Sequence, residues 1–113
     1  MKSPITTHIL DTSRGKPAQG VSIRLERFGE NGFEEIGSGT TNEDGRVTDL
    51  LDHSDFKNGT YRIHFEVAPY YAKLGQKTFY PAVSIDFIVD ASDEHYHVPL
   101  LLNPFGFSTY RGS

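Results

Sequence analysis

The chain has 113 residues, of which 36% are hydrophobic and 12% aromatic, and its formal net charge is −4. This length predicts a single domain, residues 1–113, that folds around one hydrophobic core. The chain contains no cysteine, which excludes a disulfide framework and a cysteine nucleophile, and its negative charge argues against nucleic acid or an anionic membrane as a partner.

Apolar and polar residues alternate along most of the chain, a period of two that indicates strands with one buried and one exposed face. Turn sequences such as Asn31-Gly32 and Asn58-Gly59 separate these segments, and the first suits a tight hairpin. In chain order we expect strands at about 5–11, 21–28, 33–40, 46–50, 61–67, 83–89, 95–101 and 106–110.

Residues 69–75 interrupt the strand pattern. Pro69 stands near the start of this stretch and Gly75 just past its end, which is typical of a short helix. About eight short strands with one short helix predict an all-β fold, a two-sheet antiparallel β-sandwich.

Alternation along two strands places a histidine outside the core in each. In the strand at 95–101, His97 lies on the face opposite the apolar one, together with Leu101. In the first strand, His8 shares its face with Leu10. A face that carries both histidine and leucine suits a surface covered by a second subunit, so we expect the two histidines to line a cavity between subunits.

The closing residues, Tyr110-Arg111-Gly112-Ser113, follow a strand-like run directly. Chain ends commonly fray, but a tail that leaves a core strand is held in place. This tail can bring a phenol, a guanidinium, a hydroxyl and a terminal carboxylate to one place, so we expect it to form part of a site.

The same residues also have ordinary interpretations. A single strand histidine is most often a surface or packing residue, and we assign His53, His64 and His95 to that class. Arg46 follows a turn, where an arginine is usually solvated, and Tyr110 would commonly be a packing aromatic.

Four stretches of the chain share a pattern with a known family. They are THILDTSRGKPAQGVSIRLER (7–27), TTNEDGR ending at Arg46, GTYRIHFEV followed by APYYAKLG, and HYHVPLLLNPFGFSTYRGS (95–113). Together they resemble the transthyretin-related family, and specifically its enzyme branch, the 5-hydroxyisourate hydrolases. The last motif is the most specific, because hormone-carrying transthyretins lack the Tyr-Arg-Gly-Ser ending.

The resemblance implies a transthyretin-like sandwich and a homotetramer, in which edge strands pair into dimers and two dimers enclose a central channel that holds the sites. It implies hydrolysis of 5-hydroxyisourate to 2-oxo-4-hydroxy-4-carboxy-5-ureidoimidazoline in urate degradation, with no metal and no cofactor. The catalytic residues carried over are His8, Arg46, His97 and Ser113. The substrate-binding residues carried over are His8, Arg46, Tyr110 and Arg111.

The chemistry of these side chains fits a hydrolysis. Either His97 or His8 would activate the water, and the other would position the substrate or protonate the departing nitrogen. The Arg46 guanidinium would stabilise the developing oxyanion. Tyr110 would hydrogen-bond the flat ring, and Ser113 would orient a histidine or the water.

Three alternatives stay open at this point. A metal-dependent hydrolase would use His95, His97 and His8 as zinc ligands. A transthyretin-like carrier would hold an aromatic ligand in the channel without catalysis, because fold alone does not fix function. A structural module of a larger assembly is the third.

The sequence also bears on where the protein resides. No apolar stretch approaches the roughly 20 residues of a membrane span, and the N-terminal residues show no secretory signal. We therefore expect a cytoplasmic protein that does not bind membranes, while a precursor whose leader had been removed would look the same.

Overall fold

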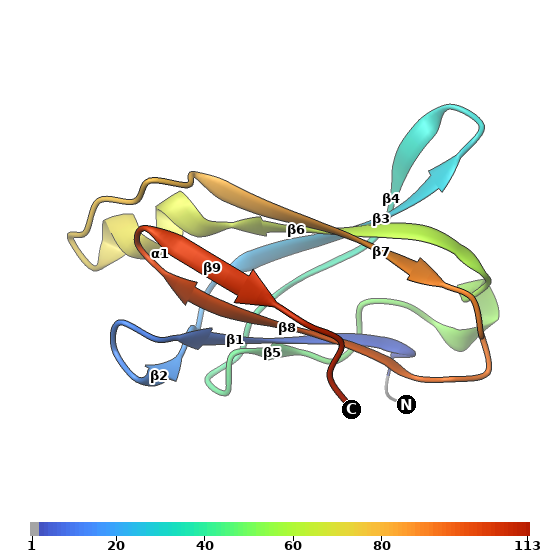
Figure 1. The fold of residues 1–113 in the computed structure, drawn as a ribbon, viewed down its shortest axis with the longest axis horizontal. Helices are drawn as coiled ribbons and strands as arrows, with labels where there is room; N and C mark the ends of the chain where they lie inside the picture. The colour runs from blue at the N-terminus through green and yellow to red at the C-terminus, as the bar shows by residue number, and fades with distance from the viewer. Residues whose placement is uncertain (1–2) are drawn as a thin grey trace.

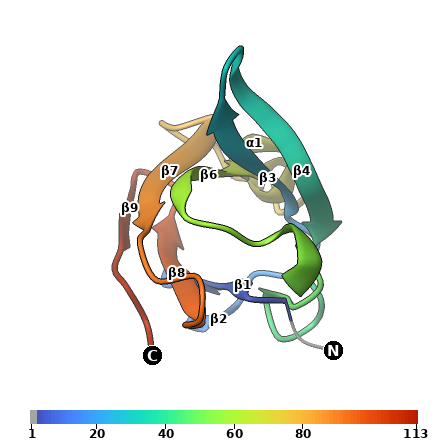
Figure 2. The ribbon, with the colours of Figure 1, turned by 90° about the vertical axis from the view of Figure 1, so that its right-hand side faces the viewer.

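The computed structural model describes residues 3–113, which form a sandwich of two facing sheets (Figures 1 and 2). Within these residues, the first sheet contains β1 (Ile5–Asp11), β2 (Lys16–Pro17), β5 (Arg46–Val47), β8 (Tyr96–Asn103) and β9 (Gly106–Thr109). The second contains β3 (Ser22–Gly29), β4 (Gly32–Thr40), β6 (Gly59–Glu66) and β7 (Ala82–Val89). A short 3-10 turn, η1 (His53–Asp55), and one helix, α1 (Val67–Lys73), complete the described chain. The predicted all-β, two-sheet sandwich is confirmed.

The pairing of strands in the first sheet sets the position of the candidate site. Its order is β2-β1-β8-β9, and β5 pairs with β1. Among the described residues, the paired strands of this sheet run antiparallel, with the exception of β1 and β8. These two run parallel, and Thr6 lies opposite His97. β5 places Arg46 opposite His8. The first strand thus lies between the two segments that carry Arg46 and His97.

The core lies between the sheets and follows the predicted alternation. Residues of β8 that face inward are at most 6% exposed, whereas His97 and Leu101 on the other face are partly exposed. In β1, Ile5 and Ile9 are fully buried while His8 and Leu10 are half-buried. Both histidines therefore lie outside the core, as the pattern predicts, because successive side chains of a strand point to opposite faces.

Three elements differ from the sequence prediction. The strand expected at 46–50 ends at Val47, and the two-residue strand β2 lies outside the strand ranges expected from the sequence. The helix begins two residues earlier than expected, because the Pro81 carbonyl accepts the backbone N–H groups of Val67 and Ala68. Pro69 then lies in the first turn, where its missing N–H is not needed. Gly75, with φ of 72°, follows the end of the helix.

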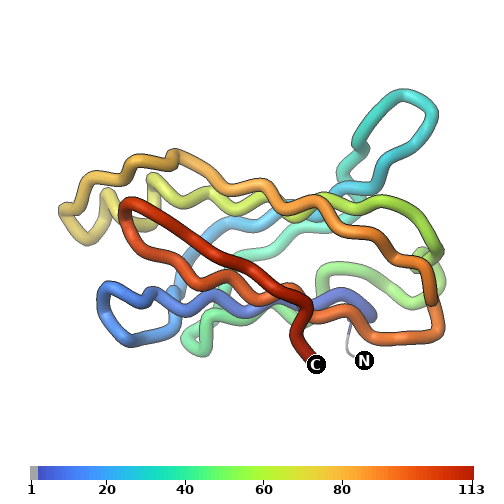
Figure 3. The backbone as a smooth tube through the Cα atoms, in the orientation of Figure 1, coloured from blue at the N-terminus to red at the C-terminus, as the bar shows by residue number. Residues whose placement is uncertain are grey.

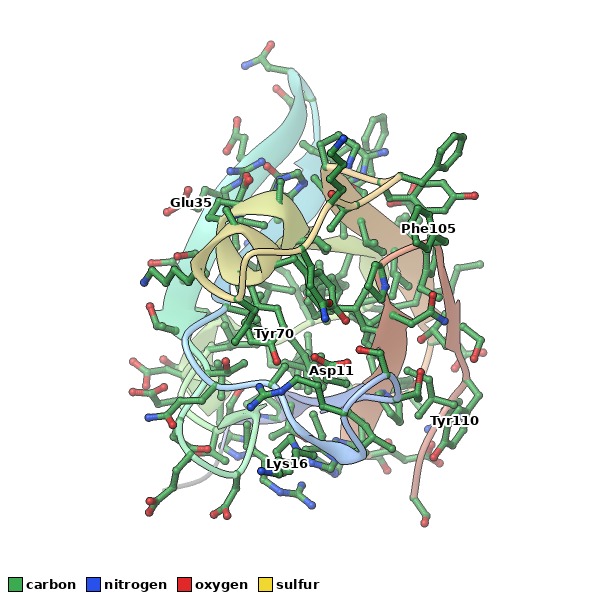
Figure 4. The ribbon with its side chains drawn as sticks, turned by 90° about the vertical axis from the view of Figure 1, so that its left-hand side faces the viewer. Asp11, Lys16, Glu35, Tyr70, Phe105 and Tyr110 are labelled. Atoms are coloured by element: carbon green, nitrogen blue, oxygen red, sulfur yellow. The ribbon has the colours of Figure 1, made fainter. Side chains whose placement is uncertain are left out.

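A buried carboxylate ties the helix to the first sheet (Figure 4). Asp11 is fully buried and accepts hydrogen bonds from the Tyr70 hydroxyl at 2.8 Å and the Ser13 hydroxyl at 2.6 Å. Burial alone would raise the pKa of Asp11, but the hydrogen bonds from Ser13 and Tyr70 lower it below its usual value. The carboxylate is therefore ionised and fixes α1 against the end of β1.

Two features lie at the periphery of the sandwich. The hairpin between β3 and β4 extends beyond the two layers (Figure 3). At the other edge, the C-terminal residues leave β9 and return toward β8, where Gly112 forms a bridge with His97.

No helix within residues 3–113 has the length and apolar character needed to cross a membrane.

Candidate active site

Three strands of the first sheet present polar side chains on the same outer face. A shallow hollow with a volume of about 330 Å³ lies there. It is lined by Thr6, Thr7, Arg46, Thr48, His95, His97 and Ser113. Three residues predicted from the sequence, Arg46, His97 and Ser113, are thus brought together. His8 stands opposite Arg46 in the β1–β5 register, beside the hollow.

The His97 ring is held from one side by a threonine that the sequence analysis did not single out. Thr6 Oγ1 lies 2.8 Å from His97 Nδ1 and 3.0 Å from His95 Nε2. The two rings are nearly parallel, with centroids 6.4 Å apart. His95 is exposed, as expected of a surface histidine, yet it also belongs to this cluster. The position of His95 two residues before His97 could have identified it as part of the site. No sequence pattern indicated that Thr6 belongs there.

His8 has a perturbed pKa. Partial burial lowers the pKa of its imidazole from the ordinary value of 6.5, and the positive charge of Arg46 lowers it further. A hydrogen bond to the backbone of Asp44, and the charge of Asp44, act in the opposite direction without cancelling the effect. At neutral pH the ring is therefore uncharged and can accept a proton or a hydrogen bond.

The C-terminal tail packs directly against His97. The Gly112 N–H donates a hydrogen bond to the His97 carbonyl at 2.8 Å. A Cβ added at Gly112 would lie only 2.6 Å from His97 Cδ2 and 3.2 Å from Pro99 Cγ. Glycine is needed here because the backbone of the tail touches the imidazole ring. The tail therefore buttresses His97 and brings Ser113 to the hollow.

Tyr110 and Arg111 lie on a different side of His97. They line a second hollow of about 370 Å³ between the β7 edge and β8, and His97 borders both hollows. Tyr110 is 59% exposed beside β9 (Figure 4). Arg111 donates to Glu94 at 3.0 Å, and its guanidinium carbon lies 4.3 Å from the centroid of the Tyr96 ring. Three of the four tail residues therefore divide between the two hollows, Ser113 in the first and Tyr110 and Arg111 in the second.

The three-histidine zinc arrangement considered in the sequence analysis is not present in the described part of the chain. Within residues 3–113, no group of three or more His, Asp or Glu side chains is placed to hold a metal ion. His95 and His97 each have a ring nitrogen within hydrogen-bonding distance of the Thr6 hydroxyl.

Known proteins resemble this chain in both sequence and fold. A model of the HIUase/Transthyretin family matches residues 5–112. Mouse 5-hydroxyisourate hydrolase is 44% identical, over 98% of this chain and 96% of its own length. The structure of Klebsiella pneumoniae 5-hydroxyisourate hydrolase is 36% identical, with a TM-score of 0.83 over 96% of this chain and 98% of that one. Sea bream transthyretin, solved in complex with thyroxine, is 28% identical, with a TM-score of 0.92 over 97% and 95% of the two chains. The chain therefore belongs to the HIUase/Transthyretin family.

Proposed function

We propose that this protein hydrolyses 5-hydroxyisourate, opening its six-membered ring at an acyl–nitrogen bond to give 2-oxo-4-hydroxy-4-carboxy-5-ureidoimidazoline in urate degradation. The observation that carries the proposal is the convergence of Arg46, His97 and Ser113 on one hollow, with an uncharged His8 beside it. Relatives from mouse and Salmonella dublin, 44% and 41% identical over nearly the whole chain, bear the name of this hydrolase.

His97 activates the attacking water. Its ring is held by Thr6 on one side and packed against Gly112 on another, so its orientation is fixed before the substrate binds. General-base assistance by a positioned histidine contributes about 100- to 10,000-fold to the rate. His97 is therefore the residue whose loss has the largest expected effect.

Arg46 and His8 act on the substrate as a pair. The exposed Arg46 guanidinium faces the same hollow as His97 and stabilises the negative charge that develops on the carbonyl oxygen. His8, uncharged because its pKa is lowered, positions the substrate by a hydrogen bond and handles the proton of the departing nitrogen. The reaction then requires neither a metal nor an organic cofactor.

The tail residues complete the proposed site from two sides. Ser113 lies in the hollow with Arg46 and His97, where its hydroxyl orients the water or a histidine. Tyr110 and Arg111 line the second hollow that His97 borders, and from there they contact the substrate ring. The Arg111–Glu94 ion pair also keeps the tail against the body of the protein.

We also propose the homotetramer predicted from the sequence, with sites in a central channel. The outer face that carries the histidines is partly apolar, with Leu10 and Leu101 half-buried in the single chain. Exposed aromatic and aliphatic side chains on β7 and the β8–β9 hairpin, such as Ile88 and Phe105, provide further surface for subunit contacts. The cytoplasmic location expected from the sequence stays a prediction.

A coupled assay tests the activity. Urate oxidase generates 5-hydroxyisourate from urate in the cuvette, and ultraviolet absorbance follows its decay with and without this protein. His97→Asn, His8→Asn and Arg46→Lys are each expected to slow the decay strongly. His64→Asn is the matched control, because His64 lies on β6 of the other sheet and is bound by Ser84 and Glu66. Wild-type rates in all three site variants would contradict the assignment.

A carrier function is the second candidate, since the TM-score of 0.92 with sea bream transthyretin exceeds that with the bacterial hydrolase. The same assay separates the two. Thyroxine binding measured by calorimetry without any acceleration of substrate decay would favour the carrier, whereas substrate turnover would favour the hydrolase.

A further inference from the structure

The Thr6 hydroxyl occupies an unusual position between two imidazole rings. It lies 3.0 Å from His95 Nε2 and 2.8 Å from His97 Nδ1, and Thr6 itself is only 5% exposed. Register explains the placement, because Thr6 stands opposite His97 in the parallel β1–β8 pair, and His95 precedes His97 by one strand period. The three groups therefore form a continuous hydrogen-bonded row.

A threonine hydroxyl carries one proton, which limits how this row can be bonded. When both rings are uncharged, the hydroxyl donates to one ring nitrogen and accepts from the other. If His97 Nδ1–H donates to Thr6, then Thr6 donates to His95 Nε2, and His97 Nε2 is left as a basic lone pair. In the opposite arrangement, His97 Nε2 carries the proton and is no base. The tautomers of the two rings are thus coupled through Thr6.

We propose that Thr6 and His95 are positioning residues that hold His97 in its basic tautomer and relay its proton to the surface. This inference rests on the proposed hydrolase function, with His97 as the base. It assigns a catalytic purpose to two side chains outside the residue set that the sequence predicted.

The relay conserves protons at each step. His97 Nε2 takes a proton from water as the water oxygen attacks the substrate carbonyl. His97 Nδ1 releases its own proton to Thr6 Oγ1, and Thr6 passes its hydroxyl proton to His95 Nε2. His97 ends uncharged as the other tautomer, and His95 becomes an imidazolium that gives up its Nδ1 proton to solvent.

His95 is placed to exchange that proton. Its side chain is exposed and lines a further hollow of about 400 Å³, in addition to the one that it shares with Arg46 and His97. His53 from η1 and the carboxylates of Asp93 and Glu94 line the same hollow. His95 therefore connects the hydrogen-bonded row to an exposed hollow, where solvent can take up the proton.

Kinetics test the relay first. Thr6→Val removes the hydroxyl while keeping the shape of the side chain. It is expected to lower kcat about fivefold, the factor that one hydrogen bond of about 1 kcal/mol represents, with KM within about twofold. Thr6→Ser restores the hydroxyl and should recover most of kcat. His95→Gln keeps a hydrogen-bonding group but cannot take the proton, so it should also lower kcat. Thr12→Val is the control, because the Thr12 hydroxyl donates to the Leu102 carbonyl and is no part of the row that joins His95 to His97.

A spectroscopic readout separates the relay from the proposed function. In wild-type protein labelled with ¹⁵N, long-range ¹H–¹⁵N spectra should show His97 protonated on Nδ1. In Thr6→Val the population should shift toward the Nε2–H tautomer that a histidine side chain prefers in water, while Thr12→Val should match wild type. Absence of substrate turnover in wild type would refute the function and leave this measurement decisive for the relay. An unchanged His97 tautomer in Thr6→Val, or wild-type kcat in Thr6→Val or His95→Gln, would overturn the relay.

Discussion

Replacing Gly112 with alanine places one methyl group at the contact between the tail and His97. The new Cβ would lie 2.6 Å from His97 Cδ2 and 3.4 Å from His97 Cγ, whereas ordinary carbon contacts begin at 3.4 Å. The nearest pair must therefore separate by 0.8 Å, the difference between 2.6 and 3.4 Å. The substitution is small in volume but is aimed at the proposed base.

The displacement has two possible outcomes, and both harm the site. If the ring moves, its 2.8 Å contact with Thr6 is disturbed, because the donor–acceptor distance of a hydrogen bond can vary by only a few tenths of an ångström. If the tail moves, the bond from the Gly112 N–H to the His97 carbonyl is lost and Ser113 leaves the hollow. A misplacement of about 1 Å in a catalytic constellation can lower the rate about 100-fold. One lost hydrogen bond lowers the free energy of unfolding by only about 1 kcal/mol.

We therefore expect Gly112→Ala to lower kcat about 100-fold in the urate-oxidase-coupled assay, while its free energy of unfolding in urea changes by about 1 kcal/mol. Gly106→Ala is the matched control. It adds the same methyl group in the β8–β9 hairpin, where the nearest atoms are those of the Asn103 amide at 3.8 Å. If the two variants turned over substrate equally fast, the packing of the tail on His97 would have no catalytic role.

Three further predictions concern charge and packing. Arg46→Gln should raise the pKa of His8 toward 6.5, because a nearby positive charge is removed; an NMR titration that found no rise would contradict this. The pKa of Asp11 is lower in the folded chain than in the unfolded one, so its stabilising effect is present above the unfolded pKa of about 3.8 and lost as pH falls through the folded value. Asp11→Asn should therefore destabilise the protein by about 1–3 kcal/mol at pH 7 and by less in acid, as urea unfolding at several pH values would measure. Leu25→Ala, at a fully buried position, should lower the free energy of unfolding by about 2–5 kcal/mol, and Phe28→Ala, at a side chain that is 60% exposed, by much less.

The period of two was sufficient to predict the faces of the strands but not their pairing. His97 and His8 were placed on the outer face from alternation alone, and the structure confirms both. The adjacency of Thr6 to His97 depends on a parallel pairing between β1 and β8, which lie about 90 residues apart in the sequence. Such non-local register leaves no local signal in one sequence. For this reason Thr6 was missed, and His95 was assigned only a surface role.

The tail shows a similar division. The sequence analysis predicted that the tail is held in place, because it directly follows a strand. The bridge between Gly112 and His97 confirms this prediction. Its two-sided arrangement was not predicted, because the chain leaves β9 at Thr109 and crosses back to β8 only at Gly112. Beyond the end of a strand, alternation no longer determines where side chains point. Tyr110 and Ser113 consequently reach different hollows, and their roles in substrate binding and catalysis stay predictions.

The separation of the two faces also explains how one fold accommodates different activities. Inward residues of β1 and β8 form the core, while His8, Arg46 and His97 point outward, so the site can change without disturbing the fold. Sea bream transthyretin accordingly has a TM-score of 0.92 at 28% identity. If this reasoning holds, Arg46→Gln, at an exposed position, should abolish most of the turnover and change the free energy of unfolding by no more than about 0.5 kcal/mol. A loss of several kcal/mol would instead mean that the fold depends on the arginine, and that activity and stability cannot vary independently at this face.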